Sequence, residues 1–225
     1  MLYRNGLIMY DHQTESLWSH ILGRAIAGDL KGTQLTLLPA LQTDWGTWKA
    51  LHPDTLVVSP DKFGRDPYAS YYRSGAEGVV TRRGAFPFGE GGPLRDDDIP
   101  SKEYVIGVRL AGQARAYRFS LLNDHPVIND EIGGIAVAVL FDRATASGAV
   151  FDRTLADGTV LTFASGNEPR RVGDAETSSE WDILTGTAIS GPLAGTQLAQ
   201  VPATYAFWFG WVDYHPDTTV YTITE

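Results

Sequence analysis

The sequence has no cysteine and only two methionines among its 225 residues. Disulfide bonds, thiolate metal sites and a cysteine nucleophile are therefore excluded, although the lack of cysteine does not fix the compartment. Long apolar runs are missing too: no stretch of about 18 apolar residues exists that could form a transmembrane helix. The start of the chain, MLYRNGLIMYDH, also lacks the apolar segment of a signal peptide.

Basic residues are scarce relative to acidic ones. The chain has 18 Lys and Arg against 27 Asp and Glu, which gives a formal net charge of -9 at pH 7. Nucleic-acid binding needs a basic face, so this balance argues against such a partner. The hydrophobic fraction of 43% and the charged fraction of 20% are ordinary for a folded globular protein.

Familiar catalytic motifs are absent as well. The sequence contains no HExxH zinc motif, no phosphate-binding P-loop and no dinucleotide fingerprint. The segment from Ala164 to Asn167 lacks the Gly-x-Ser-x-Gly pattern of a nucleophile elbow. The acidic run from Asp96 to Asp98 precedes a proline, and we interpret it as a solvent-exposed loop. We therefore predict no cofactor and no metal site.

What the chain does contain is a long internal repeat. Residues 11–58 align without a gap to residues 174–221, shifted by 163 positions, and nearly half of the aligned residues are identical. A period of this length is the size of a domain and not of a solenoid repeat. The β-rich stretch at 104–166 would have its counterpart almost entirely before Met1, so the repeat predicts that roughly 60 residues of a first unit are missing.

The identical positions are mostly glycine, proline, tryptophan and turn-forming aspartate. Such residues define turns and anchor cores, and a site used once would rarely be kept twice. Both copies also end on the sequence His-Pro-Asp-Thr, at 52–55 and 215–218. We therefore interpret five repeated residues as scaffold: Asp11, Trp18, His52, Trp181 and His215.

The order of the expected elements indicates a mainly β, α+β fold with hairpin-rich sheets and short helices. Turn signals predict hairpins at 2–10, 104–119, 127–142 and 149–166, the last turning at Asp157-Gly158. A short helical turn is expected at 120–125, before a proline. Each copy adds a short helix with two tryptophans three residues apart. We expect strands before and after these helices, at 34–40 and 56–59 and at 197–203 and 219–222.

Composition divides the chain into three parts. Residues 1–59 represent the C-terminal part of a first repeat unit, which is incomplete, and residues 103–225 represent a complete second unit. Between them, residues 60–102 are rich in Gly, Pro, Arg, Asp and Tyr, which is typical of a connector. Its aromatic residues, Tyr71 and Tyr72 among them, either bind a ligand or pack on the adjoining sheet, and we expect packing.

The segments YDHQTESLW, RDPYASYY, VIGVRLAGQARAY and NDHPVIND, with the repeated HPDT, are distinctive. Together they resemble the bacterial family called domain of unknown function 3179, and they cover most of the chain. The resemblance implies a two-unit layout with a Cys-Pro-Leu-Cys stretch in the first unit, but it implies no reaction. That stretch would lie upstream of Met1. In the second unit, Asp142 and Thr145 stand where the thiols of the family would be.

The region around His125, which the repeat does not cover, holds the main candidates for chemistry. His125 lies among carboxylates, which can orient an imidazole as a general base. The alternative is a helix-ending turn in which polar side chains satisfy backbone groups. The catalytic candidates are His125, Asp130 and Asp174, and the binding candidates are Asn123, His125, Asn129, Tyr71 and Tyr72.

Three functions are compatible with the sequence. The first is a binding or structural domain of an exported bacterial protein, periplasmic or extracellular, without intact catalytic machinery. The second is a hydrolase that acts on a polar or polymeric substrate through histidine and carboxylate chemistry, and the third is a carbohydrate-binding module that uses Trp or Tyr. An incomplete first unit also predicts an open sheet edge, and hence a homodimer.

Overall fold

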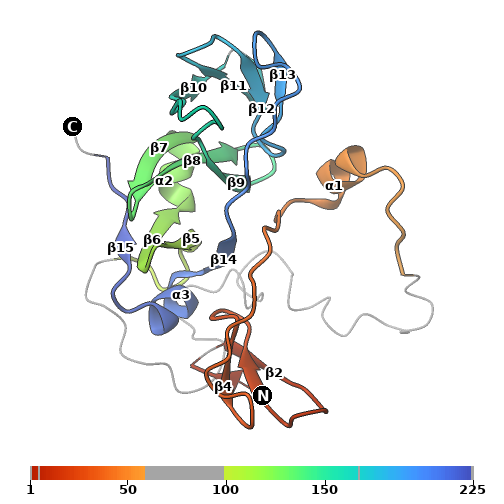
Figure 1. Ribbon diagram of the computed structural model, residues 1–225, viewed down its shortest axis with the longest axis vertical. Coiled ribbons are helices and arrows are strands. Elements are labelled where there is room, and N and C mark those ends of the chain that lie inside the picture. Colours follow the sequence, from red (N-terminus) through yellow and green to blue (C-terminus); the bar gives the residue numbers. More distant parts are fainter. Residues whose placement is uncertain (1, 5, 59–98, 167, 224–225) are drawn as a thin grey trace.

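A computed structural model describes residues 2–4, 6–58, 99–166 and 168–223, and the fold is mainly β, as predicted. Figure 1 shows the described elements spread along one long axis, with a small sheet at each end and two further sheets between them. The expected connector at 60–102 falls almost entirely outside the described residues, and so do Tyr71, Tyr72 and the run Asp96–Asp98. Within the described residues, no helix is long and apolar enough to span a bilayer.

The two end sheets have the same design. Each has four antiparallel strands that lie in sequence order. The first sheet consists of β1 (Leu2–Tyr3), β2 (Gly6–Tyr10), β3 (Leu17–Ser19) and β4 (Arg24–Ala27). The other consists of β10 (Phe163–Ser165), β11 (Arg171–Asp174), β12 (Glu180–Asp182) and β13 (Ala188–Ser190). A register shift falls at the same aligned place in both, beside Trp18 and beside Trp181.

The two central sheets carry the predicted hairpins. The three-stranded sheet consists of β7 (Val127–Ile132), β8 (Ile135–Asp142) and β9 (Ser147–Asp152). The four-stranded sheet has the order β14-β5-β6-β15, with β5 (Tyr104–Leu110), β6 (Gln113–Arg118), β14 (Ala203–Phe207) and β15 (Thr219–Val220). Strand β15 pairs parallel with β6, and the other neighbours pair antiparallel.

The three helices in the described residues all end at a histidine followed by proline. They are α1 (Trp45–Leu51), α2 (Phe119–Asp124) and α3 (Trp208–Tyr214). The backbone N–H groups of His52, His125 and His215 each donate to the carbonyl four residues earlier, at 2.8–3.0 Å. A proline disfavours the helical conformation of the residue before it, so each histidine closes its helix.

Three clusters of buried side chains hold these elements together. The first lies between the β8–β9 hairpin and the β10–β13 sheet, and Phe151 and Trp181 are fully buried in it. The second lies between the two central sheets around Tyr117. The third packs α3 on β5 and β6 through Trp208 and Trp211. These clusters make the central sheets and α3 the rigid base of the molecule.

Several expected strands are absent from the structure. Residues 34–40 and 197–203 make isolated bridges instead of the predicted strands, because the chain pairs briefly at Gln34 and Gln197 and then runs on to a proline. Residues 56–58 form no strand, unlike their counterpart β15, since no described strand lies beside them in the way that β6 lies beside β15. The Asp157-Gly158 turn forms, but only one bridge flanks it. Its neighbours β9 and β10 pair with β8 and β11 instead.

We predict that Gly107→Ala destabilises the fold. A Cβ at Gly107 would lie 2.4 Å from the ring of Trp211, which is itself buried, so the third cluster must rearrange. Overpacking of this kind costs about 1–3 kcal/mol, which urea denaturation would measure as a lower midpoint. Gly173→Ala in β11 is the matched control, because its Cβ meets no atom within 4 Å. Equal stability of both variants would contradict the packing described.

Candidate functional site

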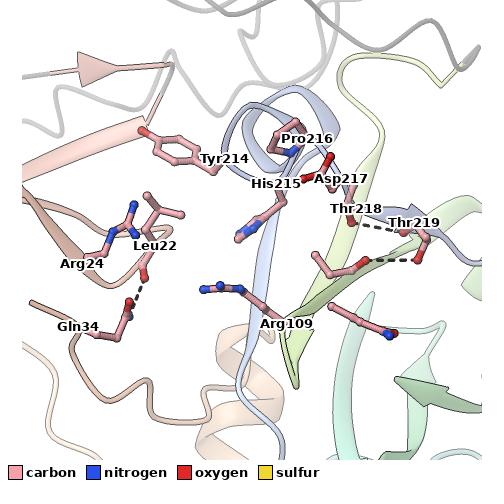
Figure 2. Close-up of a pocket in the computed structure, with 13 residues that line it drawn as sticks. Leu22, Arg24, Gln34, Arg109, Tyr214, His215, Pro216, Asp217, Thr218 and Thr219 are labelled. Carbon is pink, nitrogen blue, oxygen red and sulfur yellow. Dashed lines mark hydrogen bonds between the residues drawn. The ribbon is translucent and has the colours of Figure 1, made fainter. Parts of the chain in front are cut away.

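Several charged and polar groups converge on a site between the first sheet and the base of the molecule. It is a cavity of about 400 Å³ formed by the β3–β4 connection, the tip of the β5–β6 hairpin and the end of α3 (Figure 2). Contacts between α3 and the first sheet hold its walls together. Tyr214 donates a hydrogen bond to the carbonyl of Tyr3, and Arg4 donates to the carbonyl of Asp213 at 3.3 Å.

Two arginines and a histidine face this cavity. Arg24 comes from β4, Arg109 from β5 and His215 from the end of α3, and Figure 2 shows the three side chains around the same space. Neither arginine forms an ion pair with any described carboxylate. Asp217, two residues after His215, also lines the cavity. The lining therefore holds two guanidinium charges against one carboxylate, in a chain whose net charge is -9.

Local structure fixes the first wall of the cavity. Gly23 adopts a positive φ of 58° in the β3–β4 turn, where a Cβ would lie 2.6 Å from Leu37. The amide of Gln34 donates to the carbonyls of Leu22 and Gly23, both at 2.9 Å. This closed turn places Arg24 at the start of β4 and keeps it on the cavity side. The glycine recurs as Gly186 and the glutamine as Gln197, but the arginine does not.

His215 is held in a fixed orientation. Its ring lies over the indole of Trp211, with the ring centres 4.0 Å apart, and its carbonyl accepts the N–H of Thr218 at 3.0 Å. Burial, and then the positive charge of Arg109, lower the pKa of His215 from 6.5 to about 4. The imidazole is therefore neutral at pH 7. It can accept or donate a hydrogen bond beside the two guanidinium groups.

A second cavity of about 530 Å³ adjoins the first and is more apolar. The two share Arg109 and His215 in their linings. Leu35, Leu37 and Leu38 line the second cavity, and Leu38 is 79% exposed. Solvent-exposed leucines beside a cationic cavity suit a ligand with an anionic group and an apolar part.

His125 lies at the end of a helix. It is exposed, and it closes α2 in the same way that His52 closes α1 and His215 closes α3. Its side chain makes no hydrogen bond with any described residue. Asn123, two residues earlier, is also exposed. The geometry is that of a helix-ending turn.

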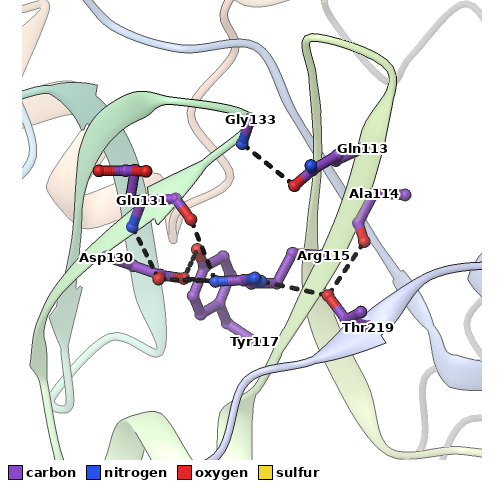
Figure 3. A network of polar contacts seen from close by, with 8 residues as sticks. All are labelled: Gln113, Ala114, Arg115, Tyr117, Asp130, Glu131, Gly133 and Thr219. Atoms are coloured by element: carbon purple, nitrogen blue, oxygen red, sulfur yellow. Dashed lines mark hydrogen bonds and ion pairs between the residues drawn. The ribbon is translucent and has the colours of Figure 1, made fainter.

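Asp130 belongs to a different network, shown in Figure 3. Its two carboxylate oxygens accept hydrogen bonds from Arg115 at 2.6 and 2.7 Å, and Tyr117 donates to one of them at 2.7 Å. Arg115 also bonds the hydroxyl of Thr219 at 3.1 Å. Burial, and then the charge of Asp130, raise the pKa of Tyr117. The network connects β6, β7 and β15, and it leaves Asp130 neutralised by an arginine.

Asp174 has a third environment. It accepts the indole N–H of Trp181 at 2.8 Å and the hydroxyl of Thr177 at 2.9 Å. Asp11 makes the same contacts with Trp18 at 2.7 Å and with Thr14. Burial alone would raise the pKa of Asp174, but the hydrogen bonds lower it. The bonds from Trp18 and Thr14 lower the pKa of Asp11 to about 2.

The remaining binding candidate, Asn129, is part of the sheet framework. Its side-chain amide donates to the carbonyl of Phe163 at 2.8 Å, and its side-chain oxygen accepts the N–H of Phe163 at 2.9 Å. This pair of bonds joins β7 to β10. His125, Asp130 and Asp174 thus lie in three separate environments, and no described contact brings them together.

Asp142 forms a third turn of the kind that Asp11 and Asp174 form, and this turn was not predicted. Asp142 accepts the hydroxyl of Thr145 at 2.8 Å, and Thr145 bonds the hydroxyl of Ser147 at 2.8 Å. The spacing Asp-x-x-Thr-x-Ser is the same at positions 11–16 and 174–179, and this signal is readable from the sequence. The two positions that the resemblance gives to thiols are therefore side by side, in a polar turn.

The cationic cavity was also missed. Arg24, Gln34 and Arg109 were not predicted as site residues, and His215 was interpreted as scaffold only. The sequence carries a signal for one of them, because Gln34 recurs as Gln197. Arg24 and Arg109 lie in strands far apart in the chain, so only the folded structure brings them together.

Among the described residues, no group of three or more His, Cys, Asp or Glu side chains is placed to hold a metal ion. No curated protein and no solved structure matches the chain. One protein family matches it, over residues 1–218, and its description is "Protein of unknown function (DUF3179)". Because the match covers nearly the whole sequence, the chain belongs to the DUF3179 family.

Proposed function

We propose that this protein is a non-catalytic binding domain whose cationic cavity takes a small anion with an apolar part. The observation that carries the proposal is the pair Arg24 and Arg109, which face one cavity beside His215 without a described ion-pair partner. Guanidinium groups bind carboxylate, sulfonate or phosphate oxygens through charge-assisted hydrogen bonds. The adjoining leucine-lined cavity is the place for the apolar part of the ligand.

The hydrolase alternative has less support. A general base works best with a pKa near the working pH, whereas hydrogen bonds lower the pKa of Asp174. Asp130 is neutralised by Arg115, and His125 is exposed at a helix end. Glycoside hydrolysis needs two carboxyl groups that face each other across a cleft. No described contact of Asp130 or Asp174 is with a second carboxyl group.

The carbohydrate-binding alternative also has little support. Sugar-binding tryptophans lie open at the surface, but Trp181, Trp208 and Trp211 are almost fully buried. Trp18 is half-buried and donates its indole N–H to Asp11. Trp45 is the exposed exception, and it lies on α1 and not in either cavity.

The repeated scaffold supports the division into two related units that we infer from the sequence. Asp11 and Asp174 bind their tryptophans in the same way, and Trp48 and Trp211 donate to Thr55 and Thr218 at 3.0 and 2.9 Å. In this view, residues 1–59 are the C-terminal part of a first unit and residues 103–225 are a complete second unit. The binding cavity lies where the first copy meets the second.

Removing either arginine should weaken ligand binding. We use 1-octanesulfonate as the probe and isothermal titration calorimetry as the measurement. We expect Arg24→Gln and Arg109→Gln each to weaken binding about tenfold, because each removes a charge-assisted hydrogen bond. Lys31→Gln is the control, since it removes one exposed charge outside both cavities. Equal affinity of the unchanged chain and the three variants for 1-octanesulfonate would contradict the proposal. So would binding of 1-octanol, which has no anionic group, with the same affinity as 1-octanesulfonate.

Binding of the same probe should become tighter as the pH falls. In the free protein, burial and Arg109 keep the pKa of His215 at about 4. A bound sulfonate offsets the charge of Arg109 and favours the imidazolium, so the pKa of His215 rises and a proton is taken up on binding. Affinity should therefore increase from pH 7 towards pH 5. The control His215→Gln should bind with little dependence on pH, and an unchanged pH profile in this variant would rule out His215 as the source.

A further inference from the structure

A cavity of about 310 Å³ lies where the β7–β9 sheet meets the β10–β13 sheet, and Figure 1 shows these two sheets one above the other. Its walls are the start of β7, the turn after β8 and the β10–β11 connection. Phe141, Val172 and Ile183 line it and are almost fully buried. Asn129 joins β7 to β10 through two hydrogen bonds, so the walls are held in place. No lining residue is shared with the cationic cavity.

Three arginines line this cavity, and they come from two different walls. Arg143 lies in the turn after β8, whereas Arg170 and Arg171 lie where the β10–β11 connection enters β11. Arg143 donates to the backbone carbonyl of Asp124 at 2.7 Å and has no carboxylate partner among the described residues. Guanidinium groups gathered from separate segments repel one another, so an anion between them is favoured.

The carboxylate next to this cavity is shared by two of the arginines. Asp182 forms ion pairs with Arg170 at 3.1 Å and with Arg171 at 3.8 Å, both through the same oxygen, Oδ2. Its other oxygen accepts the backbone N–H groups of Leu184 at 3.0 Å and of Thr185 at 2.9 Å. One carboxylate oxygen therefore serves two guanidinium groups.

The acidic residues of the lining itself are Asp142 and Glu168. The oxygens of Asp142 are used within its own turn, where they accept the N–H of Ala144 at 3.0 Å and the hydroxyl of Thr145 at 2.8 Å. Glu168 is exposed and forms no ion pair with any described arginine. Each guanidinium has five N–H groups, so most of them have no acceptor among the described residues.

The backbone at Arg170 favours a different residue. Its φ of 61° lies in the left-handed region, which glycine and asparagine adopt more readily than arginine. The connection in the first end sheet is shorter, because Tyr3 pairs with Gly6 there, whereas Ser165 pairs with Val172 across the β10–β11 connection. A sheet of this design therefore forms without the longer connection. An arginine at such a position points to a role for its side chain.

We propose that this cavity binds a small phosphate monoester with an apolar ester group. A phosphate monoester has three terminal oxygens, so it can accept hydrogen bonds from Arg143, Arg170 and Arg171 together, whereas a carboxylate has two oxygens. The buried side chains of Phe141 and Val172 form the apolar surface for the ester group. This site is separate from the cationic cavity, because the two have no lining residue in common.

The test is isothermal titration calorimetry with phenyl phosphate as the probe and the full chain as the receptor. We expect saturable binding that Arg143→Gln and Arg171→Gln each weaken about tenfold, because each removes a charge-assisted hydrogen bond. Glu168→Gln should tighten binding about threefold, since it removes an exposed negative charge from the lining. Arg24→Gln is the control, because Arg24 lines the cationic cavity only.

Arg170→Asn separates binding from folding. Asparagine adopts the positive φ readily, and Asp182 keeps its hydrogen bonds from Leu184 and Thr185. The urea midpoint of this variant should therefore match that of the unchanged chain. Its affinity for phenyl phosphate should nevertheless fall about tenfold, because one of the three guanidinium groups is lost.

Four results would overturn the proposal. The first is the absence of saturable phenyl phosphate binding, and the second is equal affinity of the unchanged chain and the three arginine variants of this cavity. The third is loss of binding in Arg24→Gln, which would place the probe in the cationic cavity instead. The fourth is binding of benzoate as tightly as phenyl phosphate, which would assign the cavity to carboxylates.

Discussion

The repeated tryptophans of this fold need acceptors for their indole N–H groups, and the rest of the structure is arranged around those acceptors. A buried donor without a partner costs about 1–3 kcal/mol. Asp174 supplies the acceptor for Trp181, and Thr218 supplies it for Trp211. Asp174 also accepts the backbone N–H groups of Thr177 and Ser179, so one carboxylate fixes both a turn and a core side chain. This double use explains why aspartate and tryptophan recur together in the two copies.

The histidines that end the helices also have a structural role. Three helices end at a His-Pro pair, and the conformational restriction before proline is sufficient to explain the stop. His215 differs in that it lines the cationic cavity described above, together with Arg24 and Arg109. His52 has the same stacking on its tryptophan without an arginine neighbour of this kind among the residues described. The surroundings, and not the motif, thus decide which histidine has chemistry available to it.

Much of the fold could be predicted from the sequence, because local signals control it. Gly112, Gly133 and Gly134 adopt positive φ in the predicted hairpin turns, and the helices before His-Pro lie where the tryptophan spacing placed them. The strands at 34–40 and 56–58 were predicted wrongly, because strand formation depends on a neighbour that is distant in sequence. The cavity could not be predicted for the same reason. Arg24 and Arg109 are brought together by packing of the first sheet on α3, which no local pattern encodes.

His125 and the carboxylates near it in sequence do not form one site among the described contacts. Arg115 binds the carboxylate of Asp130, and Arg143 donates to the backbone carbonyl of Asp124. His125 ends α2, whereas Asp130 lies in β7, so residues that are close in sequence belong to different elements. The cationic cavity shows the opposite effect, because it brings together groups that lie far apart in sequence. Arg24 of β4 lines the same space as Arg109 of β5 and His215 at the end of α3, so the cavity needs residues from both the first sheet and the central part of the molecule.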